Sequence, residues 1–270
     1  MDELTRLLRR DPDPASFNRK AYLVGHLQGA HYRRSRVTRT RRLYDRYDFG
    51  FGVVTNVGVM ALANDALWPG TSPPMNTLAT CLSMATGTGV TAAAQTDLFL
   101  QTPDTAPSAG GVATLLAPPG LGNKAQQVVA TLNYLGAEAV TEWGLLNGGG
   151  PGGVTTGTPW TAGTPTTGTV TGTPYTPSGA TARGQTQSVF VDTTKAPNIF
   201  SLCVANTSSV ITVPAWYNVS NGAASSAPPT NGDSLRMYPL LLDHMSFAPI
   251  NVVAGDAIQF SFTLTFPSGG

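Results

Sequence analysis

The sequence predicts a mainly β fold: a β-sandwich, jelly-roll-like or immunoglobulin-like, with an extended basic N-terminal arm. Three observations predict it. Only 11% of the 270 residues are charged, against roughly 25% in ordinary soluble domains. The chain holds 30 glycines and 21 prolines, a composition that suits short strands joined by turns. After residue 78, about seven to nine segments have the composition of strands, a number that fits a sandwich.

The clearest strand signal lies near the C-terminus, in residues 257–266. Apolar and polar side chains alternate there with period two, which is typical of a strand with one buried face. The apolar set is Ile258, Phe260, Phe262, Leu264 and Phe266. Weaker versions of this pattern predict further strands at residues 124–134, 139–146, 187–192, 199–205 and 210–217.

The segment 50–67 changes character along its length. It begins with valines, which favour a strand, and then reads as a helix that carries Met60, Leu62, Ala63 and Leu67. Residues 68–74 then predict a loop. Residues 78–86 predict a buried strand, while residues 97–100 fit either a short helix or the start of a strand.

Residues 148–185 are of low complexity, because Thr, Gly and Pro recur there with few core-forming side chains. Such a tract predicts a long loop, an extended arm or a hairpin held by its neighbours. Trp160 and Tyr175 are the candidate contacts of this loop with another subunit or a ligand. The expected organisation is an arm at residues 1–50 and a body at 51–270, interrupted at about 148–185.

Charge is distributed unevenly between these two parts. Residues 1–48 contain 12 of the 16 basic side chains and six acidic ones, a net charge of +6. Residues 49–270 contain four basic and nine acidic side chains, a net charge of −5. A basic segment attached to an acidic body is the pattern of an interaction arm.

The arm combines a short amphipathic segment with a stretch rich in arginine and tyrosine. Both residue types are common in interface cores, because they bury a large area and keep a hydrogen-bonding end. The candidate docking residues are Leu4, Leu7, Leu8, Tyr22, Tyr32, Arg33, Arg34, Arg36, Arg39, Arg41, Arg42 and Tyr44. The segment fits a solvated arm and an arm that orders on a partner equally well. Direct nucleic-acid binding is less favoured, because the body is acidic.

Motifs of catalysis, cofactor binding or metal binding are not found in the sequence. Asp243 and His244 adjoin, but we interpret His244 as a turn or interface residue. Glu138 and Glu142 lie in a predicted strand, so their spacing does not indicate a glycosidase pair. Cys81 and Cys203 fit two buried thiols better than a disulfide. We therefore expect no enzyme activity, no cofactor and no metal.

Four segments together resemble tail-associated virion proteins of tailed bacteriophages. In chain order they are residues 54–62 (VTNVGVMAL), residues 84–98 with a Gly-Thr-Gly turn, residues 141–146 (TEWGLL) and residues 247–266. The resemblance implies a β-sandwich in a tail, collar or fibre-anchoring position, without catalysis. Residues 1–48 and 148–185 depart from the shared pattern, which leaves the position in the particle open.

The expected function is therefore that of a structural component of a bacteriophage virion, assembled in the host cytoplasm. Its expected partners are portal, adaptor, tail or capsid subunits and further copies of itself. The uncharged stretches 66–96 and 143–182 are broken by proline and glycine, so no membrane span is expected. The alternative is a capsid decoration or fibre-like protein that binds the host surface, with Trp160, Tyr175, Trp216 and Tyr217 stacking on sugars.

Overall fold

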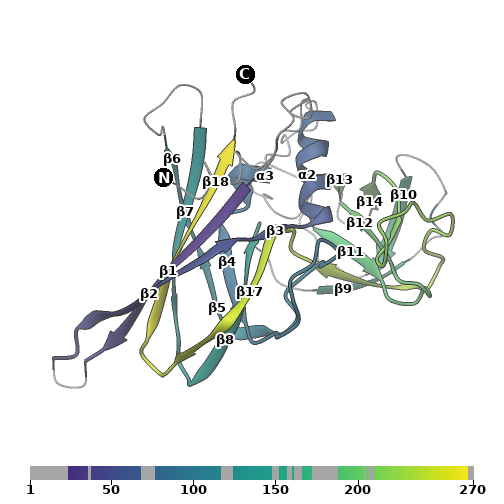
Figure 1. Ribbon diagram of the computed structural model, residues 1–270. Helices are drawn as coiled ribbons and strands as arrows, with labels where there is room; N and C mark the ends of the chain where they lie inside the picture. Colours follow the sequence, from purple (N-terminus) through teal and green to yellow (C-terminus); the bar gives the residue numbers. More distant parts are fainter. Residues whose placement is uncertain are drawn as a thin grey trace.

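A computed structural model gives the structure of the chain, and it describes residues 24–35, 38–67, 77–116, 124–147, 152–156, 160, 166–171, 188–203, 205–206 and 210–266. These residues form three antiparallel sheets and two helices (Figure 1). The prediction of a mainly β fold is confirmed. Among the described residues, no helix has the length and apolar character needed to cross a membrane.

The first sheet joins the N-terminal and C-terminal strands of the described chain. Its spatial order is β2 (Arg41–Phe51), β1 (Val24–Arg34), β18 (Ala257–Phe266), β7 (Lys124–Asn133) and β6 (Val112–Leu116). The predicted strand at 257–266 is β18, and it lies in the middle of this sheet. Its apolar face is buried, as the period-two alternation requires.

The second sheet also has five strands. Its order is β3 (Val53–Val54), β17 (Leu241–Val252), β8 (Glu138–Leu146), β4 (Ser83–Gly87) and β5 (Pro103–Gly110). It faces the first sheet across a core of aromatic and aliphatic side chains. Trp143 on β8 lies between Phe260 and Phe262 on β18, with ring centroids 6.4 and 5.2 Å apart. This arrangement is consistent with the predicted sandwich.

The third sheet forms a lobe beside the other two, drawn at the right of Figure 1. Its order is β13 (Ala205–Asn206), β14 (Val210–Val213), β10 (Thr166–Thr171), β9 (Gly152–Thr156), β16 (Ser234–Tyr238), β11 (Val189–Asp192), β12 (Ile199–Leu202) and β15 (Tyr217–Asn218). Residues 189–238 thus contribute strands to this third sheet, whereas β17 and β18 belong to the two facing sheets, so residues 186–270 do not all join one sandwich. The lobe lies in the chain between β8 and β17, which pair with each other.

The low-complexity tract contributes two of these lobe strands, so it is not a plain loop. β9 and β10 pair as a hairpin, one of the three alternatives that its composition allows. Residues 97–100, by contrast, form neither the helix nor the strand expected of them. They belong to an irregular segment, residues 88–102, that connects β4 to β5.

Two helices connect the first strands of the chain. α2 (Asn56–Leu67) follows β3, as the sequence predicts, and Thr55 precedes it as an N-cap whose Oγ1 accepts a hydrogen bond from the Gly58 amide at 3.0 Å. A Cβ at Gly58 would lie 2.7 Å from the Leu242 carbonyl oxygen, so glycine lets the helix approach β17 closely. α3 (Thr77–Thr80) occupies the start of the segment predicted as a strand at 78–86.

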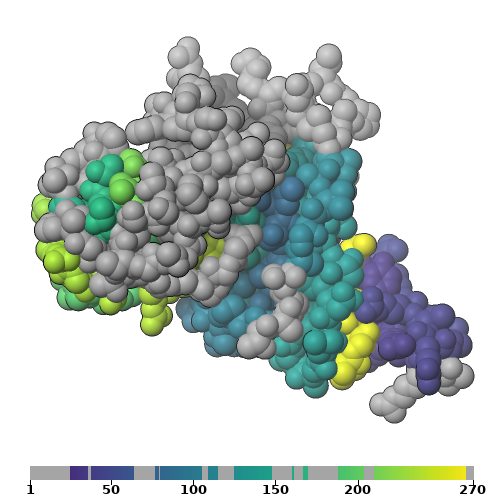
Figure 2. Space-filling model, turned by 180° about the vertical axis from the view of Figure 1, so that it is seen from behind, coloured from purple at the N-terminus to yellow at the C-terminus, as the bar shows by residue number. Residues whose placement is uncertain are grey.

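The predicted division between an arm at 1–50 and a body at 51–270 needs correction. β1 pairs with β18 over nine residue pairs, from Val24 with Thr265 to Tyr32 with Ala257. The described part of the expected arm is therefore a β-hairpin built into the first sheet. Figure 2 shows this hairpin (purple) projecting beyond the end of the sheets. Residues 1–23 lie outside the described residues.

Candidate functional site

The projecting half of the β1–β2 hairpin is the candidate site, because it gathers the predicted docking residues. β1 pairs with β18 only as far as Tyr32. Beyond that residue, β1 contacts β2 alone, and the pairs continue to Arg34 with Arg41. The base of the hairpin is thus held on both sides of β1, while its end stands clear of the first sheet.

Two pairs of arginines lie directly opposite each other at this end. In the register of the two strands, Arg33 is paired with Arg42 and Arg34 with Arg41. Like charges in directly opposed positions destabilise an antiparallel pair. A hairpin that only had to stay folded in water would be more stable with opposite charges there.

The turn that closes the hairpin is ordered by its own hydrogen bonds. The Ser35 amide donates to the Thr40 carbonyl at 2.9 Å, and the Arg39 amide donates to the Ser35 carbonyl at 3.0 Å. Arg39 has a φ of 54°, in the left-handed region that non-glycine residues seldom adopt. This conformation places another exposed arginine at the end of the hairpin.

Arg33 attaches the hairpin to the turn between β17 and β18. Its Nε lies 3.3 Å from Oδ2 of Asp256, a carboxylate that is only 1% exposed. His31 Nε2 contacts the same oxygen at 3.0 Å. The guanidinium carbon of Arg33 also lies 3.9 Å from the centre of the Tyr44 ring, within the range of a cation–π contact.

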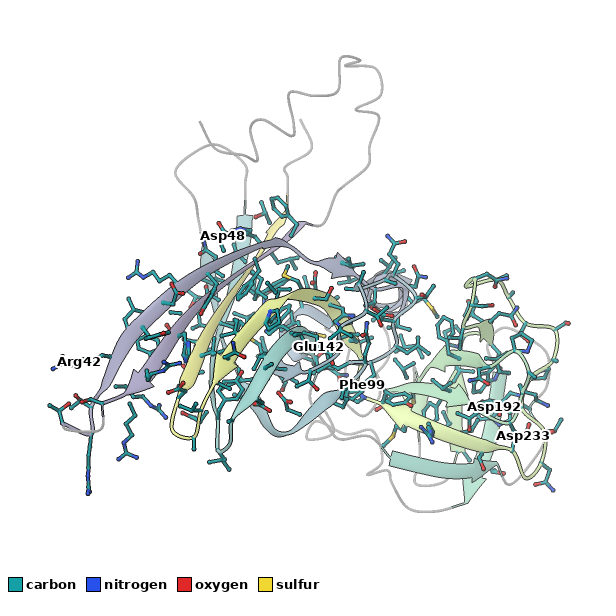
Figure 3. All side chains as sticks on the ribbon, turned by 60° about the horizontal axis from the view of Figure 1, so that its bottom comes forward. Arg42, Asp48, Phe99, Glu142, Asp192 and Asp233 are labelled. Atoms are coloured by element: carbon teal, nitrogen blue, oxygen red, sulfur yellow. The ribbon has the colours of Figure 1, made fainter. Side chains whose placement is uncertain are left out.

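The other arginines are less restrained. Arg41 Nη2 donates to Oδ1 of Asn133 at 2.6 Å, and Arg34 Nε donates to the Arg39 carbonyl at 3.3 Å. Arg34, Arg39, Arg41 and Arg42 are all exposed. Figure 3 shows Arg42 at the end of the hairpin, directed away from the sheets. The arrangement is a preformed strand pair with a concentrated positive charge.

The remaining predicted site residues have different outcomes. Trp160 is 4% exposed and packs edge-on against Trp216 in the lobe core, with ring centroids 5.2 Å apart. Its burial gives no support to the expected contact of Trp160 with another subunit or a ligand. The other candidates lie outside the described residues: Leu4, Leu7, Leu8, Tyr22, Arg36 and Tyr175.

A second cluster, which the sequence analysis did not assemble, lies on the outer face of the second sheet. His244 Nδ1 is 2.7 Å from Oδ2 of Asp97, and His244 Nε2 is 3.2 Å from Oε2 of Glu142. His244 is 0% exposed and lies within β17, so the interpretation as a turn or interface residue is wrong. Figure 3 shows Glu142 in the interior of the molecule.

Glu142 also holds the irregular segment 88–102 in place. Its Oε1 accepts hydrogen bonds from the Thr102 amide at 2.7 Å and the Gly89 amide at 3.1 Å, and its Oε2 accepts one from the Gln101 amide at 2.9 Å. Burial favours a raised pKa for Glu142, but the hydrogen bonds from His244 and these amides outweigh it and lower the pKa.

His244 complements this carboxylate. Burial favours a lowered pKa for its imidazole, but the hydrogen bonds to Glu142 and Asp97 and the charges of both carboxylates raise the pKa. A charged imidazole between two carboxylates is a buried ion-pair network. Asp97, Glu142 and His244 therefore all have ion-pair partners. Through the bonds to Glu142 and Asp97, this cluster holds the segment 88–102 against the second sheet.

Most acidic side chains of the body are withdrawn from its surface. Residues 49–270 contain nine acidic side chains. Five of these are buried: Glu142, Asp192, Asp233, Asp243 and Asp256. In the lobe, Lys195 Nζ lies 3.2 Å from Oδ2 of Asp233, and Figure 3 shows Asp192 and Asp233 together at the far end of the lobe. More than half of the acidic side chains of the body therefore add little to the charge of its surface.

Two further expectations concern metals and thiols. Among the described residues, no group of three His, Cys, Asp or Glu side chains is arranged to hold a metal ion. Cys81 and Cys203 are buried as thiols in different core clusters, Cys81 in the large cluster that includes residues of the two facing sheets and Cys203 in the smaller cluster of the lobe. The expectation of two buried thiols agrees with this placement.

Comparison with known proteins identifies no family for this chain. No protein-family model, curated protein or solved structure matches the chain.

Proposed function

We propose that the chain is a non-enzymatic structural subunit of a bacteriophage particle, in the tail, neck or fibre-anchoring region, and that it docks onto neighbouring subunits through the β1–β2 hairpin. The facing pairs Arg33–Arg42 and Arg34–Arg41 carry this proposal. Asp256 pairs with Arg33 alone, so an acidic partner that covers the end of the hairpin would relieve the repulsion that remains among the other arginines.

The two facing sheets support this proposal as a β-sandwich body, of the jelly-roll-like or immunoglobulin-like kind expected from the sequence. The hairpin is fixed by the pairing of β1 with β18 and by the contact of Arg33 with Asp256, the residue that precedes β18. Docking through a preordered element loses less conformational entropy than docking through a flexible arm. Neighbouring portal, adaptor, tail or capsid subunits, and further copies of this chain, are the proposed partners.

The alternative of a protein that binds host-surface sugars has less support. Two of its four proposed stacking residues, Trp160 and Trp216, are buried against each other. Tyr217 is partly buried beside Phe200, with ring centroids 5.9 Å apart. Tyr175 lies outside the described residues.

Substitution of the hairpin end is the test that this structure allows. Deleting residues 1–48 would remove β1 and most of β2 together and would leave the edge of β18 unpaired, so it would disturb the first sheet as well as the docking element. A phage that encodes the chain should instead carry serine in place of Arg34, Arg39 and Arg42. Particles purified on a density gradient are then analysed by quantitative mass spectrometry.

We expect the wild-type chain in the particles and about ten-fold less of the triple serine variant, because each exposed arginine contributes a modest share of the contact energy. Arg236→Ser is the matched control, since Arg236 is exposed on the lobe strand β16. Absence of the wild-type chain from purified particles overturns the proposal. Normal incorporation of the triple variant would show that the end of the hairpin is not the docking element.

A further inference from the structure

Three turns of the chain meet at the end of the hairpin. The β7–β8 turn adjoins the β17–β18 turn, because the Tyr134 amide donates to the Asp256 carbonyl at 3.0 Å and the Gly255 amide donates to the Tyr134 carbonyl at 2.9 Å. The Arg34 side chain runs over the second of these turns, since its Cδ would lie 3.6 Å from a Cβ at Gly255.

An open groove of about 700 Å³ lies between the hairpin end and the β17–β18 turn. Arg33, Arg34 and Arg39 line it from the hairpin, and Val253, Ala254 and Asp256 line it from the turn. Asp256 already bonds to His31 and Arg33, so its charge is balanced locally. Two exposed arginines, Arg34 and Arg39, therefore face the groove beside a turn whose only carboxylate is already paired.

The turn side of the groove is apolar and exposed. Val253 is 47% exposed, and Leu135 on the adjoining turn is 81% exposed. On the hairpin, Leu43 and Tyr44 are 45% and 59% exposed. Exposed apolar side chains beside a charged groove are typical of a protein interface.

We infer that this groove binds an extended protein segment in which acidic and apolar side chains alternate. The inference rests on the proposed docking function and names the chemistry of the partner at that site. In an extended segment, successive side chains point to opposite sides. Carboxylates on one side would then meet Arg34 and Arg39, while apolar side chains on the other side cover Val253 and Ala254.

A nucleic acid is the competing occupant, because exposed arginines also bind phosphates. The apolar half of the site argues against it. A phosphate backbone offers nothing to Val253 or Ala254, whereas a peptide with apolar side chains buries both. The acidic protein segment therefore accounts for both halves of the groove.

The test measures binding of three fluorescent probes to the purified full-length chain by fluorescence anisotropy. The probes are a peptide of alternating glutamate and leucine, a peptide of alternating glutamate and serine, and a DNA duplex of random sequence. We expect the glutamate–leucine peptide to bind most tightly. The double variant Arg34→Glu/Arg39→Glu should weaken that binding about ten-fold, because the contacts become repulsive.

The variant Val253→Ser separates the apolar contribution, because Val253 lines the groove. It should weaken binding of the glutamate–leucine peptide and leave the glutamate–serine peptide unchanged. The matched controls are Arg236→Glu and Val112→Ser, which change an exposed arginine on the lobe and an exposed valine on β6. Both should bind all three probes as the wild type does.

Equal binding of the two peptides, tighter binding of DNA, or no binding of either peptide overturns the inference. None of these results decides the proposed function, because particle incorporation is measured separately. If the serine variants of the hairpin fail to enter particles while neither peptide binds, the docking function stands and the partner chemistry is wrong. If the serine variants of the hairpin enter particles normally and neither peptide binds, both proposals are wrong.

Discussion

Asp243 and His244 are consecutive residues of β17, and their buried side chains lie on opposite faces of the second sheet. His244 is held between Asp97 and Glu142 on the outer face, beneath the segment 88–102. Asp243 points inward, towards Gly25 and Gly52, and its two carboxyl oxygens have no hydrogen-bond partner among the described residues. One strand therefore carries a fully bonded ionised group and an unbonded carboxyl side by side.

Replacing Asp243 with asparagine should stabilise the protein above neutral pH. Burial raises the pKa of Asp243 to about 8, from 3.8 in the unfolded chain. Between these two values the folded state holds a proton that the unfolded state has lost, so stability falls as the pH rises. The asparagine variant lacks this loss and should be more stable at pH 8 by on the order of 5 kcal/mol.

Urea unfolding of both proteins at a series of pH values from 4 to 9 measures this difference. The gap between wild type and variant should open as the pH rises and close near pH 4. A constant gap across the range would show that Asp243 is ionised in the folded protein.

Removing His244 should release the segment 88–102. His244→Gln leaves Glu142 buried without its charged partner, which should lower the free energy of unfolding by about 3 kcal/mol. Hydrogen exchange of the Gly89, Gln101 and Thr102 amides should accelerate, because these amides donate to Glu142. Glu138→Gln is the control, because Glu138 lies on β8 with Glu142 but takes no part in this cluster. Unchanged exchange in His244→Gln would mean that other contacts hold the segment.

The same cluster predicts the pH range over which the segment is held. The pKa of His244 is raised by its carboxylate partners, so its contribution is fully present below the unfolded value of 6.5 and is lost as the pH rises through the folded value. The pKa of Glu142 is lowered, so its contribution is lost as the pH falls below the unfolded value of 4.5 and through the folded value. Amide protection at Gln101 should therefore be greatest between these two transitions, and protection that does not vary with pH would exclude the ion pair as its cause.

Arg42→Glu should separate stability from docking. The new carboxylate lies opposite Arg33 in the strand register, where it replaces a like-charge pair with an opposite-charge pair. The hairpin should gain about 0.5 kcal/mol while particle incorporation falls. Thermal unfolding and mass spectrometry of particles measure the two effects, with Arg236→Glu as the control. A variant less stable than the control would show that the opposed arginines do not repel each other in the isolated chain.

Gly168→Ala tests how closely the low-complexity tract packs. A Cβ at Gly168 would overlap the Trp160 indole, which fills the lobe core. Overpacking of this kind should lower the free energy of unfolding by about 2 kcal/mol. At Gly136, a Cβ would have no atom within 4 Å, so Gly136→Ala should change stability little. Equal effects of the two substitutions in urea unfolding would contradict the packing described for Trp160.

The strands with regular alternation could be predicted from the sequence, and β17 could not. β18 alternates cleanly because one of its faces is buried and the other is not. β17 buries Asp243 and His244 as well as apolar residues, and its pairing with β8 shifts register between Ser246 and Ile250. Both features destroy the periodicity on which a strand prediction depends.

The basic hairpin was recognised as a charged segment but not as part of a sheet. β2 is an edge strand with mostly exposed side chains, so its composition resembles that of a solvated arm. Glu142 and His244 were considered separately for the same kind of reason. They lie 102 positions apart in the chain, and only the pairing of β8 with β17 brings them together.

Taken alone, the sequence determined the mainly β class, the best alternating strands, the helix after Thr55 and the concentration of arginine between residues 33 and 46. These features are local, because they follow from side-chain periodicity, capping and charge within a few residues. Tertiary structure alone decided that the hairpin joins β18, that the lobe is separate and that five carboxylates are buried. Those outcomes depend on contacts between distant segments, and no local pattern encodes which strand a given edge will pair with.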